Sequence, residues 1–95
     1  MTWNFEWDEA KAAQNLAERG LHFSDASRFD WTSAQVFLDD RQDYTEERFI
    51  ARGFLDGQLH ILVYVLRNDR LRVISLRRAN ARECKRYAQE RTQPE

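Results

Sequence analysis

The sequence predicts an α+β domain, with an antiparallel sheet and helices packed on one of its faces. A run of strand-like segments joined by short polar turns occupies residues 34–77, two helical patterns precede it and a third follows it. With 95 residues, of which 42% are hydrophobic and 13% aromatic, the chain can form one core, so we expect a single domain over residues 1–95. The predicted order is a short strand, two helices, four strands and a final helix.

The first predicted elements are a strand and a helix. Trp3, Phe5 and Trp7 alternate with polar residues, which is typical of a strand with one apolar face. Asp8 is a suitable N-cap for a helix over residues 9–19, and the glycine that follows is a typical C-terminal signal. Four residues at helical spacing are predicted to form the buried stripe: Ala12, Ala13, Leu16 and Ala17. Three others share a second face, which is either solvated or one wall of a site: Lys11, Asn15 and Arg19.

A short second helix and four strands make up the middle of the chain. Ser24 is predicted to cap the helix, which ends between Phe29 and Trp31. The strands are predicted at residues 34–38, 47–55, 59–67 and 71–77. Asp56-Gly57 is a strong signal for a two-residue hairpin, and the strand at 59–67, being the most apolar, is expected to be central.

The last helix is predicted to begin after Asn80, which has Glu83 at capping-box spacing. Its apolar stripe is thin: Cys84, Tyr87 and Ala88. Because this stripe buries little area, we expect a loosely held terminal helix.

Charge is distributed unevenly along the chain although the net charge is only −1. Residues 1–47 contain eleven acidic and four basic residues, whereas residues 67–91 contain nine basic and three acidic ones. The two halves either neutralise each other across the folded surface or leave a basic surface for a phosphate backbone or an acidic partner.

Several classes of protein are disfavoured by composition. The single cysteine excludes an internal disulfide, and the longest apolar run, residues 61–66, is too short to cross a membrane, so we expect a soluble cytoplasmic protein. Glycine-rich phosphate loops and nucleophile elbows are missing, and His22 and His60 lie on different elements. Asp39-Asp40 and Glu46-Glu47 could bind a metal but are more typical of surface charge.

Arginines give the strongest functional signal. Strict alternation along the last strand would place Arg72, Ile74, Leu76 and Arg78 on one face and Val73, Ser75 and Arg77 on the other. Neighbouring strands could add Arg48, Arg52 or Arg67. RNA cleavage by attack of the 2′-hydroxyl needs a base, an acid and cations for the pentacovalent phosphate, and arginine suits the last role. The alternative, that these arginines pair with the acidic half, stays open.

Three segments resemble the BrnT family, the ribonuclease toxins of type II toxin–antitoxin systems. They are FEWDEAKAAQNLAERGLHF at residues 5–23, DYTEERFIARGFLDGQLHILVY at 43–64 and RVISLRRANARECKRY at 72–87. The resemblance implies a RelE-like α+β fold and cleavage of RNA without a metal or other cofactor, which arrests translation. It also implies an antitoxin of the BrnA type that wraps the toxin and carries a DNA-binding domain, so that operator DNA is contacted only through the antitoxin.

The resemblance carries over residue by residue. Matching positions are Trp7, Asp8, Lys11, Asn15, Glu47, Arg48, Arg72, Ser75, Arg77, Arg78, Glu83 and Tyr87. Of these we expect catalytic roles for Lys11, Glu47, Arg48, Arg77, Arg78 and Glu83. We expect RNA binding by Asn15, Arg19, Arg72 and Tyr87. In this hypothesis Arg77 and Arg78 hold the scissile phosphate, Lys11 and Arg19 hold flanking phosphates, and Glu47 or Glu83 transfers the proton.

One departure from the family pattern bears on activity. Family members usually carry Lys-His-Gly where this chain has Glu18-Arg19-Gly20. An arginine cannot transfer protons near neutral pH, although His22, three residues on, could substitute. The alternative function is therefore a non-catalytic module that binds the antitoxin and acts as a co-repressor. A plain DNA-binding domain, using Arg82, Lys85 and Arg86, is the third reading, but no helix-turn-helix pattern precedes these residues.

Overall fold

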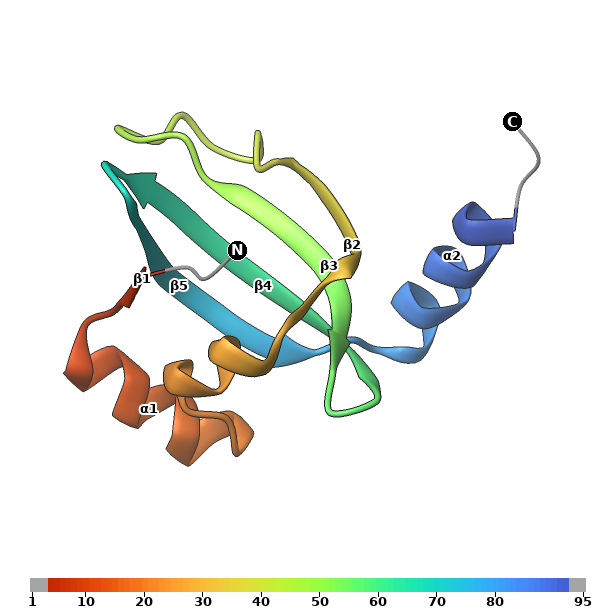
Figure 1. Ribbon diagram of the computed structural model, residues 1–95, viewed down its shortest axis with the longest axis horizontal. Helices are drawn as coiled ribbons and strands as arrows, with labels where there is room; N and C mark the ends of the chain where they lie inside the picture. The colour runs from red at the N-terminus through yellow and green to blue at the C-terminus, as the bar shows by residue number, and fades with distance from the viewer. Residues whose placement is uncertain (1–3, 93–95) are drawn as a thin grey trace.

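A computed structural model describes residues 4–92 of the chain and confirms the α+β class (Figure 1). The elements follow the predicted order, except that a 3₁₀ segment takes the place of the second helix. The elements are β1 (Asn4–Glu6), α1 (Glu9–Arg19), η1 (Phe23–Arg28), β2 (Asp30–Leu38), β3 (Phe49–Leu55), β4 (Gln58–Arg67), β5 (Arg70–Arg78) and α2 (Ala81–Thr92). Trp3, which was predicted to open the first strand, lies outside the described residues.

The sheet has five strands in the order β1-β5-β4-β3-β2, with β4 in the centre as predicted. Strands β2 to β5 form an antiparallel meander, but β1 pairs in parallel with β5, Phe5 opposite Leu71. The prediction of a purely antiparallel sheet was therefore wrong. Short links impose antiparallel pairing only on strands that follow each other in the chain, whereas β1 meets β5 after most of the domain has intervened.

Positive φ angles occur at the turns where the sequence predicted or permits them. Asp56 (φ 51°) and Gly57 (φ 80°) form the two-residue link between β3 and β4, which confirms the hairpin. Asn68 (φ 56°) lies in the short link between β4 and β5, and asparagine tolerates the left-handed region better than most residues.

Helix α1 has the predicted caps but not the predicted buried stripe. Asp8 Oδ1 accepts a hydrogen bond from the Lys11 backbone N–H at 3.1 Å, and Gly20 ends the helix with φ 74°. Ala12 is fully buried, whereas Leu16 is 48% exposed, and Ala13 and Ala17 are also exposed. The helix therefore contacts the sheet along a narrow line of Ala12 and Asn15, which are three residues apart, rather than along a broad apolar face.

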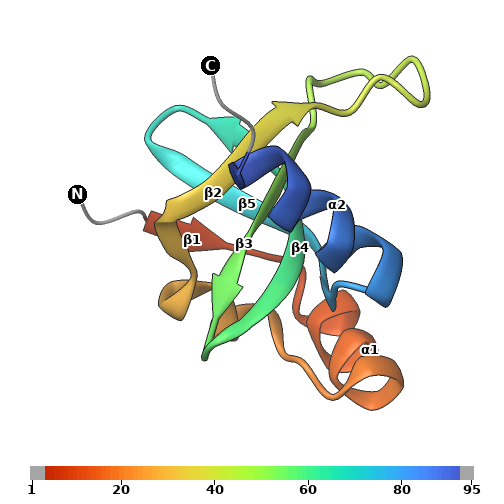
Figure 2. The same cartoon turned by 90° about the vertical axis from the view of Figure 1, so that its right-hand side faces the viewer.

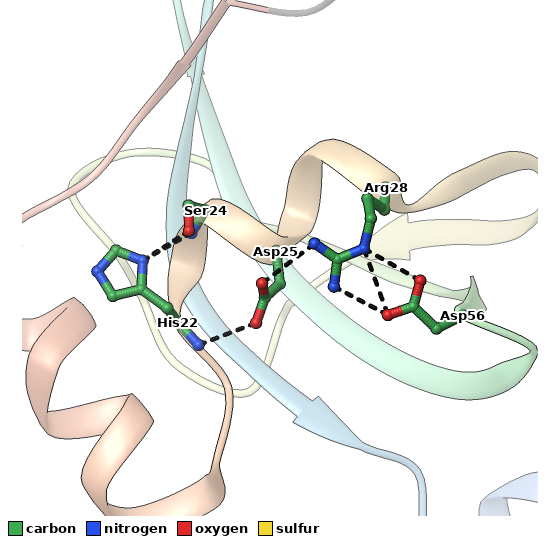
Figure 3. A network of polar contacts seen from close by, with 5 residues as sticks. All are labelled: His22, Ser24, Asp25, Arg28 and Asp56. Atoms are coloured by element: carbon green, nitrogen blue, oxygen red, sulfur yellow. Dashed lines mark hydrogen bonds and ion pairs between the residues drawn. The ribbon is translucent and has the colours of Figure 1, made fainter.

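The second helix is a single 3₁₀ segment, η1, and its cap is His22 rather than the predicted Ser24 (Figure 3). The ring Nδ1 of His22 accepts a hydrogen bond from the Ser24 backbone N–H at 3.0 Å, and the backbone N–H of His22 donates to the Asp25 carboxylate at 3.1 Å. Arg28 then donates to Asp25 at 3.2 Å and to Asp56 at 2.8 Å, which ties η1 to the turn between β3 and β4. Six residues are too few for a stable α-helix, and such short segments commonly take the 3₁₀ form.

The core lies on one face of the sheet, beneath α1 and η1. Its buried members are Ala12, Phe23, Ala26, Phe29, Ala51, Leu55, Leu62, Tyr64, Leu71, Val73 and Leu76. Figure 1 shows α1 and η1 together, while α2 stands apart from them. We call the opposite face of the sheet the open face.

Helix α2 packs against the open face, so the prediction that all helices cover one face was wrong (Figure 2). The Tyr87 hydroxyl donates to the Ser33 carbonyl at 2.5 Å, and its ring meets Phe54 edge-on. The predicted capping box is present, because Asn80 Oδ1 accepts from the Glu83 N–H at 2.8 Å and Glu83 accepts from the Asn80 N–H at 2.9 Å. Of the predicted stripe only Tyr87 is buried.

Within residues 4–92 no helix is long and apolar enough to span a membrane.

Candidate functional site

A β-bulge in β5 decides which arginines face the same way. Val63 of β4 pairs with Ser75 and Tyr64 pairs with Val73, so Ile74 is an extra residue in β5. Leu71, Val73 and Leu76 therefore all point into the core, although their spacing breaks the alternation. Alternation correctly placed Ser75 with Arg77 and Leu76 with Arg78 on opposite faces. It was wrong across Ile74, because Arg72 reaches the open face together with Arg77 and does not share a face with Leu76.

A cavity of about 400 Å³ lies on the open face, between the sheet, α2 and the loop that follows β2. We call it the main cavity. Its lining contains seven arginines: Arg19, Arg41, Arg48, Arg52, Arg77, Arg82 and Arg86. Its other residues are Phe37, Ile50, Ile61, Val63, Ile74, Ser75 and Glu83. One carboxylate among seven guanidinium groups gives the lining a strong positive potential.

Carboxylates hold four of the seven arginines in place. Glu83 accepts two hydrogen bonds from Arg77, each of 2.8 Å, in a fork-to-fork arrangement. Glu90 pairs with Arg52 at 3.0 Å and with Arg86 at 3.1 Å. The fourth, Arg41, pairs with Asp39.

The Arg41 side chain is aimed by a buried carboxylate. Asp39 accepts two hydrogen bonds of 2.7 Å from Arg41 and one of 3.2 Å from the Tyr44 hydroxyl. These donors lower the pKa of Asp39 from 3.8 to about 2. Asp39 therefore stays ionised at neutral pH, and it fixes the loop over the cavity.

The other three arginines form no ion pair with any carboxylate in residues 4–92. Arg19 only approaches the Ser75 hydroxyl, at 3.4 Å, and Arg48 stacks on the Tyr44 ring at 4.2 Å. Arg82 projects from the first turn of α2 into the lining. In addition, the buried Nε of Arg52 has no hydrogen-bond acceptor within the described part of the chain. The cavity therefore has guanidinium donors available for an anion.

Glu83 is held in its charged form. The hydrogen bonds from Arg77 are the main cause that lowers the pKa of Glu83 from 4.5 to about 2, and the Asn80 backbone N–H adds to the shift. The same pair raises the pKa of Arg77 above its usual value. A carboxylate with such a low pKa is a weak general base at neutral pH.

Two further depressions adjoin the main cavity. One shares Arg48 and Ile74 with it and is lined also by Lys11, Arg67 and Arg72. The other, between α1 and β5, shares Arg19, Ile74 and Ser75 with it and adds Lys11 and Asn15. Lys11 and Arg77 thus lie along one continuous basic surface.

A family comparison gives this basic surface a context. The model of the BrnT family, described as ribonuclease toxins of type II toxin–antitoxin systems, matches residues 7–83. The chain belongs to the BrnT family. No curated protein matches it in a separate search. Membership confirms the resemblance read from the sequence, and a type II system implies a protein antitoxin as partner.

The structure brings some of the predicted BrnT site residues together and separates others. Seven lie on the main cavity or its adjoining depressions: Lys11, Asn15, Arg19, Arg48, Arg72, Arg77 and Glu83. Glu47 lines a separate depression on the acidic loop, which shares Arg48 with the main cavity. Arg78 follows Arg77 on β5 and therefore points to the other face, where its register partner is the buried His60.

Two predicted RNA-binding residues are engaged in structural contacts. Asn15 is 9% exposed, and its Nδ2 donates to the carbonyls of Leu21 and Leu76 at 2.7 and 2.9 Å. Tyr87 is 5% exposed and uses its hydroxyl to anchor α2. Neither residue presents a free donor to the main cavity.

Sequence reasoning missed several residues of the lining. Arg41 was read only as part of a polar loop, Phe37 as an ordinary strand residue, and Arg82 and Arg86 only as possible DNA contacts. The spacing of Arg82 and Arg86, four apart on one helix face, with Glu83 at the cap, was the available signal. No local signal marks Arg41 as a neighbour of Arg77, because that proximity depends on how the loop folds back.

Proposed function

We propose that this BrnT protein is an endoribonuclease that cleaves RNA by attack of the 2′-hydroxyl on the adjacent phosphate, without a metal, and so inhibits translation in the cytoplasm. The observation that carries the proposal is the convergence of seven guanidinium groups on one cavity, three of them without a carboxylate partner among residues 4–92. The phosphorane formed by 2′-hydroxyl attack carries extra negative charge. Preorganised guanidinium groups can stabilise that charge more strongly than they stabilise the ground state.

Roles follow from position on the cavity. Arg77, in the floor, and Arg48 and Arg82, at the rim, are assigned to the scissile phosphate. Lys11 and Arg19 are assigned to flanking phosphates along the adjoining depressions. Arg72 is partly neutralised by Glu6 at 3.1 Å and is assigned a weaker flanking contact.

Proton transfer is assigned to Glu47 in preference to Glu83. Glu83 already accepts hydrogen bonds from Arg77 and the Asn80 N–H, and its lowered pKa makes it a positioning residue for Arg77. Glu47 is exposed and makes no comparable contact within the described residues. Arg78, on the far face of β5, is assigned no contact with the scissile phosphate.

A direct assay tests the proposal. Protein free of any partner is incubated with single-stranded RNA and a chelator, and the ends of the products are analysed. We expect cleavage with 2′,3′-cyclic phosphate ends, lost in Arg77→Ala and retained in the matched control Arg78→Ala. Equal activity of Arg77→Ala and wild type would remove Arg77, and with it the main cavity, from the mechanism.

A non-catalytic toxin homologue is the second candidate, and one observation favours it. Every ionisable side chain described on the main cavity lining is an arginine or Glu83, and the lowered pKa of Glu83 makes it a weak general base, so the described lining holds no histidine or lysine for proton transfer. Arg19 occupies the place at which the resembled pattern has a histidine. Intact RNA in the assay above, combined with salt-sensitive binding, would support this candidate.

The proposed partners follow from the same surface. An antitoxin of the BrnA type would cover the main cavity with acidic side chains and would supply the contacts to operator DNA. RNA and antitoxin would then compete for the same guanidinium groups, so a saturating antitoxin should abolish RNA binding.

A further inference from the structure

The floor of the main cavity is ordered into two rows that cross the sheet. Strand register places Phe37 beside Ile50, Ile50 beside Val63, and Val63 beside Ser75. The second row lies two residues further along each strand, about 7 Å from the first row. It consists of Gln35, Arg52, Ile61 and Arg77. The first row is apolar from Phe37 to Val63, and we call these three residues the apolar row; the second row carries two guanidinium groups, one on each side of Ile61.

Phe37 is the accessible end of the apolar row. It is 40% exposed, whereas Val63 of the same row is only 7% exposed and Ile61 of the second row only 5%. The Arg52 guanidinium lies over the Phe37 ring, 4.9 Å from its centre. Phe37 is not a core residue, because strand alternation directs it to the open face, away from the buried cluster.

We propose that the apolar row holds one unstacked nucleobase of the RNA, with Phe37 as its stacking platform, while the neighbouring row and the rim arginines hold the phosphates on either side. This inference rests on the proposed function and names how the site grips its substrate. An exposed aromatic ring beside a row of cations matches the two parts of a single-stranded nucleotide, a flat apolar base and an anionic phosphate. Phosphate contacts alone would not use Phe37, and a double helix would keep its bases stacked and out of reach.

Paired oligonucleotides that cannot be cleaved test the proposal. One is a six-residue deoxyadenylate strand, and the other is an abasic strand of the same length and charge. Neither has a 2′-hydroxyl, so binding is measured apart from cleavage. We expect wild type to bind the base-containing strand about tenfold more tightly, within the range that stacking on an aromatic side chain provides.

Variants assign the difference to Phe37. Phe37→Ala should bring the preference for the base-containing strand below about threefold, within the spread expected once stacking is lost, and Phe37→Tyr should keep it. Leu38→Ala, an exposed apolar neighbour (51% exposed) on the opposite face of β2, is the matched control and should keep it too. Arg82→Ala should weaken both strands equally.

The two ways to fail are distinct. Equal, salt-sensitive binding of both strands by wild type, or an equal loss for both in Phe37→Ala, would overturn the base site while leaving the ribonuclease proposal intact. Binding of neither strand would overturn both proposals. Circular dichroism of Phe37→Ala establishes that the variant is folded before its affinities are compared.

Discussion

Removing the negative charge of Glu83 should weaken the fold and strengthen nucleic-acid binding at once. Glu83→Gln keeps the size of the side chain and leaves one oxygen to accept from Asn80. Its amide cannot accept both hydrogen bonds, each of 2.8 Å, that the Arg77 guanidinium donates to the two Glu83 oxygens in the wild type. Arg77 is then free to turn its donors toward a phosphate.

The cost in stability can be worked from the pKa. A pKa lowered from 4.5 to about 2 sets an upper limit of about 3 kcal/mol for the ionised form. Because 25% of the Glu83 side chain and 37% of the Arg77 side chain are exposed, solvent screening reduces this to about 1 kcal/mol. Since folding lowers the pKa, this contribution is complete above pH 4.5 and is lost as the pH falls toward 2. Urea unfolding at pH 7 and at pH 3 should show the gap between wild type and variant closing at the lower pH.

The gain in binding can be worked from counterion release. For a single strand, one additional phosphate contact steepens the slope of log affinity against log salt concentration by about 0.7. This amounts to about fivefold in affinity at 0.1 M salt. Asp69→Asn, which removes one charge at the opposite end of β5, is the matched control and should show a much smaller gain. RNA cleavage should persist within about tenfold, since a residue that only positions Arg77 transfers no proton.

Either of two results would refute this reasoning. Weaker nucleic-acid binding by folded Glu83→Gln would mean that the carboxylate holds Arg77 in its binding geometry instead of competing with the phosphate. Unchanged binding with cleavage reduced more than a hundredfold, well beyond the effect of positioning, would assign the proton transfer to Glu83 itself.

Three further predictions concern the framework. Tyr87→Phe removes the hydrogen bond to the Ser33 carbonyl and should lower the unfolding free energy by about 1 kcal/mol. Backbone hydrogen exchange should be faster in α2 than in β4, and faster still in α2 of the variant. Equal protection of α2 and β4 would contradict a loosely held helix. Gly53→Ala places a Cβ 2.7 Å from the Phe29 ring and should lower the unfolding free energy by about 1–3 kcal/mol. This prediction fails if the variant unfolds at the same urea concentration as the wild type. Asn15→Ala leaves two carbonyls without their donor and should cost about 1–3 kcal/mol; a change in RNA affinity at unchanged stability would instead make Asn15 a binding residue.

Most features encoded within a few residues of sequence were predicted correctly, the cap of η1 excepted. The Asp8 cap and the Gly20 termination of α1, the Asp56-Gly57 turn and the Asn80–Glu83 capping box all match the structure. In each case the interacting groups lie within about one turn of the chain, so their geometry depends little on the remainder of the fold.

The main cavity was predicted only in part. Arg77, Arg48 and Arg52 were identified as cations on neighbouring strands, but their common face was not, because strict alternation was assumed across Ile74. Arg41 and Phe37 carried no local signal. Their role depends on the register of β2 against β3 and on a loop that Asp39 folds back over the sheet.

The sequence by itself determined the class of the domain, the caps of α1 and α2, the tight turns, the central position of the most apolar strand and the BrnT family. Only the tertiary structure decided the parallel pairing of β1, the face on which α2 lies and the placement of Arg72 and Arg77 on the same face. The physical reason is that a bulge or a register shift of one residue reverses which face every following side chain occupies, and its cost is set by packing between segments far apart in the chain. Local preferences are nearly the same for the alternatives, so the choice among them is made by the assembled core.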